Sequence, residues 1–530
     1  MGQRILRFFV TAALVLASLG AAPPRHSWTI PGTLRVALAS SPNTLNPILT
    51  TQLIENFIAS LIFDKLIATR PDGSFIPELA AAVPSLDNGG ISRDGRTITI
   101  HLRRNVRWHD GQPFTSADVA FTQAARMNPA NNVSDHVPYD RVVRLDTPDR
   151  YTVVVHLSKP YAPFLAKWMT AVLPAHLLAG KHDLNRDPFN AAPVGTGPFR
   201  FVRWERGRQI VLDANPGYAL GKPGLQRVIV ELMSDENSEL IALRTHEIDW
   251  VYEPSPLTAR NLGSVAGAHV EQFDTNDVFG LWLNVTQTPL DDVRVRRALA
   301  YAVDRVALVK DVAAGFADPA VADIPSYLAA FDPALRPIPY DPAKARAMLR
   351  AAGWMPGPDG ILRKNGRPLA LTCIVGTGNG AATAATIQIA AMLQAIGVDL
   401  SIKPVQANLM FAPAAAGGLL ESGHFQLTWH GYFLWDDPDD SILYACSALA
   451  PGGQNTVRFC NAGFDRWTNV ALTHYDLPTR KRAYAHTQRI LLDQVPVIFV
   501  WWQHGLHLMS DDLHGVRDRD GLSLPYRWSL

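Results

Sequence analysis

The amino-acid sequence predicts a mixed α/β protein with more than one packed unit. Segments with alternating hydrophobicity, which are typical of half-buried strands, interleave with segments whose apolar residues recur at helical spacing. The chain has 530 residues, more than a single core usually organises, so two or three units are expected. Hydrophobic residues make up 47% and charged residues 18%, which is typical of a globular protein with a sizeable core.

The first half of the chain opens with a strand at residues 34–38 and a helix at 52–63. Residues 97–108 alternate again and lead to a helix that ends at Met127. At the start of that helix, the Thr115 hydroxyl and the Asp118 carboxylate can satisfy free backbone amides. Further strands are expected where β-branched and aromatic residues gather, at 151–157, 209–214, 227–233 and 279–284.

The second half begins with one amphipathic helix over residues 293–310. The next helix has clear ends, because Asp341 can cap it, Pro342 suits its first position and Gly353 can adopt the left-handed exit conformation. The remaining elements are expected in the order helix 382–396, strand 398–405, helix 480–493 and strand 497–502.

The N-terminus predicts export. Arg4 and Arg7 precede an apolar run at 8–19 and the small residues 20–22, so residues 1–22 are interpreted as a signal peptide. The run is shorter than the roughly 20 residues that cross a bilayer, although an uncleaved anchor is the alternative. No cysteine stands there to carry a lipid. We therefore expect a periplasmic protein.

Charge argues against one class of partner. The chain carries 49 basic and 48 acidic residues, a formal net charge of +1, and no long block of one sign. Nucleic-acid binding needs a basic surface, so no nucleic-acid partner is expected.

Three cysteines are present, and export would place them where disulfides persist. Cys446 and Cys460 are the natural pair, and a bridge closing a loop of about 15 residues would contribute about 3 kcal/mol. Cys373 would remain free. The alternative is that all three are buried thiols.

Several phrases together resemble family 5 of the extracytoplasmic solute-binding proteins, which includes dipeptide- and oligopeptide-binding proteins. They occur in one order along nearly the whole mature chain. The phrases are LRVALASSPNTLNP at 34–47, TITIHLRRNVRWHDGQPFTSADVAFT at 97–122, VGTGPFRF at 194–201, PLDDVRVRRALAYAVDR at 289–305 and DPAKARAMLRAAGW at 341–354.

The resemblance implies a two-lobed periplasmic-binding-protein fold with three domains and a cleft between the lobes. A peptide or similar small molecule would be captured there and delivered to the membrane permease of an ABC importer, whose subunits are other chains. A monomer is implied. The expected division is domain I from 30–68, 190–273 and 495–530, domain II from 69–189, and domain III from 274–494.

The segment 429–440, WHGYFLWDDPDD, is the best candidate for ligand contact. Trp429 and Trp435 offer apolar walls, and the carboxylates of Asp436 and Asp437 can pair with a ligand ammonium. The alternative is a core strand followed by a solvated acidic turn.

One position departs from the family pattern. Peptide-binding relatives place an aspartate three residues after this tryptophan to hold the peptide's amino terminus, and here Tyr432 stands there. A neutral phenol cannot supply that charge. Either Asp436 or Asp437 takes over, or the ligand is a metal chelate, haem, sugar or other small molecule without a free ammonium.

The resemblance also implies that the loop after the first strand faces the ligand. Its polar residues are Ser41, Asn43, Thr44 and Asn46. The alternative is an ordinary polar turn.

The sequence gives little support for a metal site or a catalytic site. His504 and His507 follow the strand at 497–502 with no convincing carboxylate partner nearby, so no metal site is predicted. No GxSxG, HExxH or CxxC motif occurs, so we assign no catalytic residue and no cofactor. A secreted hydrolase with an unrecognised site is the third hypothesis.

Overall fold

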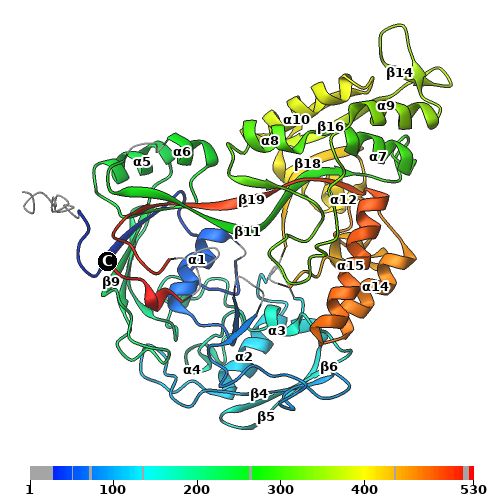
Figure 1. The fold of residues 1–530 in the computed structure, drawn as a ribbon. Coiled ribbons are helices and arrows are strands. Elements are labelled where there is room, and N and C mark those ends of the chain that lie inside the picture. Colours follow the sequence, from blue (N-terminus) through cyan, green and yellow to red (C-terminus); the bar gives the residue numbers. More distant parts are fainter. Residues whose placement is uncertain are drawn as a thin grey trace, which may run out of the picture.

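The computed structural model describes residues 28–50, 52–70, 74–133, 136–261, 265–434, 437–516 and 524–530. The predicted signal peptide, Trp435 and Asp436 lie outside these residues. Figure 1 shows two bodies joined by two long strands that run across the middle of the molecule. Within the described residues, no helix is both long enough and apolar enough to span a membrane.

The two long strands are β11 (Ala268–Leu283) and β19 (Val497–Ser510), which pair antiparallel from Ala268 opposite Ser510 to Trp282 opposite Val497. We call them the crossover strands. The pairing is interrupted between Asp274 and Val278 and shifts again after Phe279. The prediction that the last strand ends at residue 502 is wrong, because pairing with β11 continues it to Ser510.

The crossover strands belong to one 11-stranded sheet with the order β17-β16-β18-β11-β19-β10-β1-β9-β8-β7, in which β12 (Ala317–Pro319) pairs with β19. The half on one side consists of β10 (Trp250–Tyr252), β1 (Thr33–Leu38), β9 (Arg227–Leu232), β8 (Gln209–Ala214) and β7 (Phe199–Glu205). We call this half and the helices on it the first lobe. These helices are α1 (Leu53–Ile62), α5 (Glu236–Arg244) and α6 (Pro256–Asn261).

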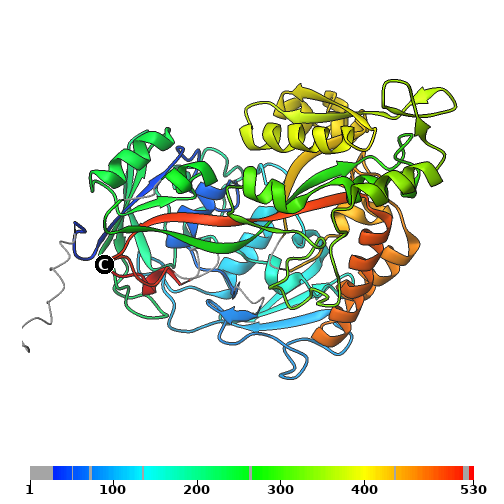
Figure 2. The same cartoon turned by 45° about the horizontal axis from the view of Figure 1, so that its top comes forward.

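The other half, which we call the second lobe, contains three mutually parallel strands, namely β16 (Ala370–Gly376), β17 (Asp399–Val405) and β18 (Leu427–Phe433). Four helices pack into the core cluster on one face: α7 (Val293–Ala302), α8 (Arg305–Asp311), α9 (Pro342–Ala351) and α10 (Gly380–Gln394). Side chains of the other face pack with α13 (Ser441–Tyr444), α14 (Ala462–Thr473) and α15 (Leu477–Gln494). Figure 2 shows the crossover strands passing from one lobe into the other. The short elements of this lobe are β13 (Met355–Pro356), β14 (Leu362–Lys364), β15 (Arg367–Pro368), α11 (Ala407–Met410) and α12 (Leu419–Ser422).

The single helix predicted for residues 293–310 is wrong. Val303 is extended, and the Asp304 carboxylate accepts a hydrogen bond from the Ala307 amide, which caps a new helix. An aspartate with this geometry satisfies a free amide that a continuous helix would have bonded itself, so it favours a break.

A third body below the sheet in Figure 1 is built on a separate sheet with the order β4-β6-β5. Its strands are β4 (Thr97–His101), β5 (Val142–Asp149) and β6 (Thr152–Leu157). The capping box at Thr115 and Asp118 is confirmed and begins α2 (Ser116–Met127). Smaller elements here are β2 (Ile67–Thr69), β3 (Phe75–Pro77), α3 (Phe164–Lys167) and α4 (Ala175–Leu178).

The structure joins Cys446 and Cys460 in a disulfide, with a Cα–Cα distance of 4.6 Å. Cys373 lies on β16 as a free, buried thiol. Burial raises the pKa of this thiol to about 12, so it remains protonated and unreactive in the folded protein.

Candidate ligand site between the lobes

Trp429 and Tyr432 lie on β18 but point to opposite faces of the sheet. Trp429 is buried against Trp501, with 5.0 Å between the ring centroids, in the core beneath the helices. Tyr432 packs near Trp282 on the face that carries α13 and α14. Side chains alternate along a strand, so residues three apart diverge. These two predicted contacts therefore cannot form one wall of a pocket.

A cavity of about 250 Å³ lies between the lobes, and Trp429 forms part of its wall. The first lobe contributes Glu253 and Pro256, which follow β10. The second lobe contributes Asn379 and Ala382, at the beginning of α10. The crossover strands close the space between them. The cavity is thus shared by both lobes, as capture of a ligand between lobes requires.

Sequence reasoning missed Glu253 and Asn379. Glu253 comes directly after β10 and Asn379 shortly after β16, and both of these strands pair with parallel neighbours. In open α/β sheets, ligands bind beyond the carboxyl ends of such strands. Their position shortly after a strand is the sequence signal that could have identified them as cavity residues.

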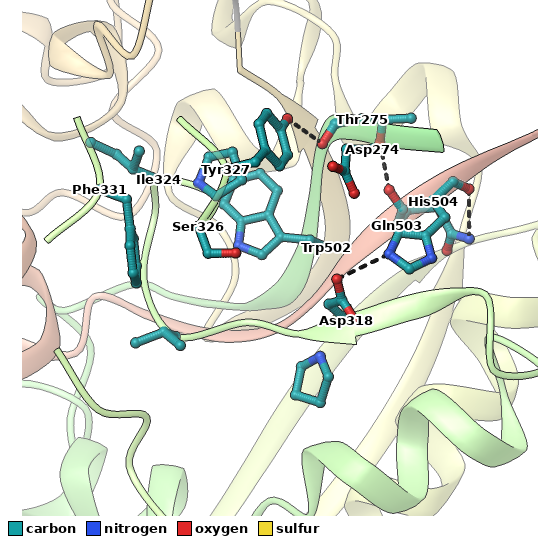
Figure 3. Close-up of a pocket in the computed structure, with 13 residues that line it drawn as sticks. Asp274, Thr275, Asp318, Ile324, Ser326, Tyr327, Phe331, Trp502, Gln503 and His504 are labelled. Carbon is teal, nitrogen blue, oxygen red and sulfur yellow. Dashed lines mark hydrogen bonds and ion pairs between the residues drawn. The ribbon is translucent and has the colours of Figure 1, made fainter. Parts of the chain in front are cut away.

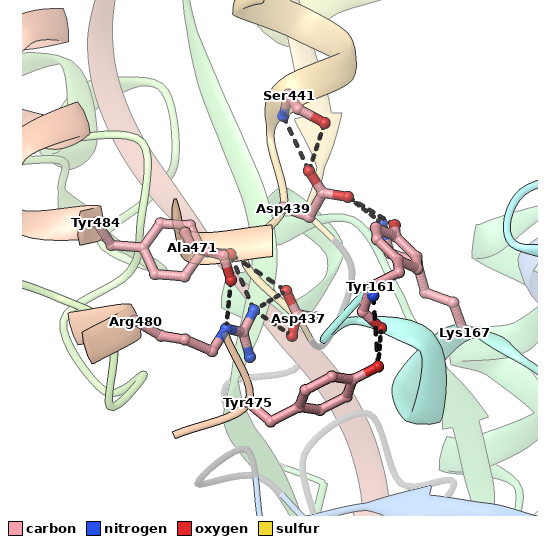
Figure 4. Close-up of polar contacts among 9 residues, drawn as sticks. All are labelled: Tyr161, Lys167, Asp437, Asp439, Ser441, Ala471, Tyr475, Arg480 and Tyr484. Carbon is pink, nitrogen blue, oxygen red and sulfur yellow. Dashed lines mark hydrogen bonds and ion pairs between the residues drawn. The ribbon is translucent and has the colours of Figure 1, made fainter. Parts of the chain in front are cut away.

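Asp437 is bound by an arginine of its own chain. Both of its carboxylate oxygens accept hydrogen bonds of 2.7 Å from Nη2 of Arg480, and its side chain is only 4% exposed. Figure 4 shows the Arg480 guanidinium lying against Asp437, with Tyr484 beside it. The charge of Asp437 is therefore already compensated, and this carboxylate does not offer a free partner for a ligand ammonium.

Asp439 connects distant parts of the chain. Its Oδ2 accepts hydrogen bonds from the Tyr161 hydroxyl at 2.7 Å and from Lys167 Nζ at 3.3 Å, while its Oδ1 accepts one from Ser441 Oγ at 2.6 Å (Figure 4). Burial alone would raise the pKa of Asp439, but Lys167 and the hydrogen bonds hold it below its ordinary value. The ionised carboxylate ties the third body to the second lobe.

The solvated acidic turn considered for residues 436–440 is wrong for the described part. Asp437, Asp439 and Asp440 are all at most 4% exposed. Burial and the neighbouring Asp323 raise the pKa of Asp440 well above its ordinary value. Two carboxyl groups in one buried site cannot both ionise cheaply, so the protonated form of Asp440 is favoured.

The loop after β1 divides into exposed and structural residues. Ser41 and Asn43 are exposed and Thr44 is half-buried. Asn46 is fully buried, its amide donates to Asn190 Oδ1 at 2.9 Å, and its Oδ1 accepts from the Ile48 amide at 3.2 Å. The polar groups of Asn46 therefore hold the loop itself.

The two histidines of the last strand differ. His507 is fully buried among aromatic rings, with 4.8 Å to Trp250, and burial lowers its pKa to about 3. His504 has a carboxylate partner that the sequence did not reveal, because its Nε2 lies 3.1 Å from Asp318 Oδ2. The expectation that His504 lacks such a partner is wrong.

Comparisons with known proteins identify the fold and family. Residues 74–454 match the model described as bacterial extracellular solute-binding proteins, family 5 Middle. The glutathione-binding protein GsiB of Salmonella typhimurium is 30% identical over 476 residues, covering 87% of each chain. The di/tripeptide-binding protein 2 of Pseudomonas aeruginosa is 29% identical over 496 residues, covering 88% of each.

Solved structures show the same architecture. NikZ from Campylobacter jejuni, in complex with Ni(L-His), has a TM-score of 0.77 at 26% identity, covering 95% of this chain and 100% of its own. AppA from Bacillus subtilis, in complex with a nonapeptide, has a TM-score of 0.75 at 23% identity, covering 94% and 100%. The chain therefore belongs to family 5 of the bacterial extracellular solute-binding proteins and has the two-lobed fold of that family.

Proposed function

We propose that this chain is the extracytoplasmic binding component of an ABC importer and closes its lobes on a peptide or a solute of similar size. The observation that carries the proposal is the cavity between the lobes, whose walls come from both lobes and from the strands that connect them. A ligand that contacts both walls binds the closed form better than the open form, and this difference drives closure.

The division into domains proposed from the sequence agrees with this mechanism. Residues 30–68, 190–273 and 495–530 would form domain I, residues 69–189 domain II, and residues 274–494 domain III. The crossover strands then carry the chain between domains I and III, where a small backbone change moves one lobe against the other.

Hydrogen bonds between the third body and the second lobe support a closed arrangement of the molecule. Besides Tyr161 and Lys167 with Asp439, the Tyr475 hydroxyl donates to the Gly95 carbonyl at 3.0 Å, and the Ala162 amide donates to the Leu472 carbonyl at 2.7 Å. All of them join domain II to domain III. Opening would return these groups to water, at a modest net cost that ligand binding can offset.

The chemistry of the cavity suits a zwitterion. Glu253 and Asp277 contribute carboxylates to its lining, and the first turn of α10, beginning after Asn379, contributes the positive end of a 15-residue helix. The two carboxylates would attract a ligand ammonium, and the N-terminal end of α10 would attract a ligand carboxylate. Ser41, Asn43, Thr44, Trp435 and Asp436 remain predicted contacts.

A second candidate is a non-peptide ligand, such as a chelate or another small molecule. Tyr432 stands where peptide-binding relatives carry an aspartate, and Asp437 is paired with Arg480. NikZ, a relative in fold, was solved with Ni(L-His).

Mass spectrometry separates the two candidates. Protein that has been exported and purified without refolding is weighed under native and then denaturing conditions, which releases whatever the cleft retains. Short peptides would support the first candidate, and a single non-peptide mass the second. Small-angle scattering with and without the recovered ligand must then show compaction, and an unchanged shape would contradict capture between lobes.

A matched pair of variants tests the cavity itself. Glu253→Gln should weaken binding of a ligand with a free ammonium by about tenfold or more, since one charge-assisted hydrogen bond contributes about 1.5–3 kcal/mol. Glu247→Gln changes an exposed carboxylate of the same lobe and should leave affinity unchanged. Equal affinity in both variants would exclude Glu253 from the site.

A further inference from the structure

Three potential metal ligands meet where β12 joins the crossover strands. Asp274 of β11 lies opposite His504 of β19 in the sheet register, and Asp318 of β12 lies opposite Trp502. Directly after Asp274 the pairing of β11 with β19 is interrupted. The interruption opens space beside His504, into which Figure 3 shows both carboxylates projecting.

The geometry is close to that of a bound ion. One ligand atom from each of Asp274, Asp318 and His504 can be chosen so that all three lie within 4.8 Å of one another. Ligand atoms around a tetrahedral Zn²⁺ stand about 3.4 Å apart, from metal–ligand distances of about 2.1 Å. Both aspartates are exposed, so small side-chain rotations can bring their oxygens to that spacing.

The histidine is already oriented for coordination. Its ring is only 9% exposed, Nε2 faces Asp318, and Nδ1 is within hydrogen-bond distance of the Gln272 side-chain amide. Turning the Gln272 amide over would place its oxygen against an Nδ1–H donor and leave the Nε2 lone pair for the ion. Metal-binding histidines almost always have such a partner on the second nitrogen.

The charge of the cluster also favours a cation. Two carboxylates lie beside one imidazole, and within the described part of the chain no lysine or arginine forms an ion pair with either carboxylate. An imidazole nitrogen with two carboxylate oxygens suits Zn²⁺, Ni²⁺ or Co²⁺, whereas Mg²⁺ and Ca²⁺ prefer oxygen ligands alone.

We propose that Asp274, Asp318 and His504 bind one divalent transition-metal ion of the Zn²⁺ and Ni²⁺ class at the crossover strands. Three protein ligands leave at least one coordination position, which faces a cavity also lined by Thr275, Ser326 and Tyr327. His504, Thr275 and Gln503 also line the cavity between the lobes, so the ion would lie at the edge of that cavity.

The test uses full-length protein stripped with a chelator and dialysed. Titration with Zn²⁺, followed calorimetrically and counted by elemental analysis, should give one ion per chain, and equimolar Mg²⁺ should not displace it. Asp274→Asn and Asp318→Asn should each weaken binding at least tenfold, and so should His504→Gln. The visible absorption of bound Co²⁺ should disappear in the same variants.

His269→Gln is the matched control. His269 also contacts two carboxylates, but Asp511 lies at its Nδ1 and Glu271 at its Nε2. One ion therefore cannot be coordinated by this ring and by both carboxylates together. Its removal should leave Zn²⁺ binding unchanged. Absence of binding in the unmodified protein, or equal binding in all variants, would overturn the proposal. If His504→Gln fails to fold, Zn²⁺ binding by the variants of the two exposed aspartates still tests the proposal.

Discussion

Removing the hydroxyl of Tyr161 should weaken ligand binding without touching the cavity. Tyr161→Phe keeps a ring that is fully buried beneath Arg141, whose guanidinium carbon lies 3.8 Å from the ring centroid. It deletes only the 2.7 Å hydrogen bond to Asp439 that joins the third body to the second lobe. In an open form, both groups would bond water instead.

The size of the effect follows from the partner's charge. A hydrogen bond to an ionised group contributes about 1.5–3 kcal/mol net of water. Asp439 keeps its contacts with Lys167 and Ser441, so the lower part of that range, about 1.5–2 kcal/mol, applies. With a factor of ten for each 1.4 kcal/mol, the closed form should lose about 10–30-fold in population relative to the open form.

The assay is calorimetric titration with the ligand recovered from the native protein, supported by small-angle scattering. Where the open form dominates without ligand, Kd should rise by the same factor. Tyr218→Phe is the control, because Tyr218 donates an equal 2.7 Å hydrogen bond to Asp64, on the side of the first lobe. It should lower stability but leave Kd unchanged. An unaltered Kd in Tyr161→Phe would refute the role of this contact in closure.

Three further predictions concern stability. Arg480→Met should lower the free energy of unfolding by about 3–5 kcal/mol, measured with denaturant, because it leaves the buried Asp437 carboxylate without its ion-pair partner. Adding Asp437→Asn to this variant should restore part of the loss, and equal losses in the single and the double variant would contradict the ion pair. Replacing both Cys446 and Cys460 by serine should cost about 3 kcal/mol, measured as a lower urea midpoint than in the unreduced parent protein. Burial raises the pKa of Glu78 from 4.5 to about 7, so the folded state holds a proton that the unfolded state has lost, and stability should fall as pH rises through that window. Glu78→Gln should flatten this slope in unfolding measured at successive pH values, and an unchanged slope would contradict the assignment.

The sequence predicted local structure well where a few adjacent residues determine it. Thr115 and Asp118 form the expected capping box, and Asp341 accepts a hydrogen bond from the Lys344 amide at the start of α9. Such caps are decided within one helical turn. The same local logic failed at Asp304, where an amphipathic pattern concealed a second cap.

Long-range partners lay beyond sequence reasoning. Asp437 looked available because Arg480 stands 43 residues away, and His504 looked isolated because Asp318 lies 186 residues away. Tertiary packing brings these pairs together, and no periodicity records it. Trp429 and Tyr432 are different, since the alternation of a strand already separates residues three apart.

The first lobe combines segments from both ends of the chain, and this determines how early the lobe can fold. Its strand β1 pairs with β9 and β10, and Arg35 binds Asp249 from 214 residues away. Its core also includes Trp528, fully buried and packed edge-on against Trp250. Synthesis proceeds from the N-terminus, so this core has no complete set of partners until the C-terminal segment has left the ribosome. We therefore expect the first lobe to fold only after nearly the whole chain has been synthesised.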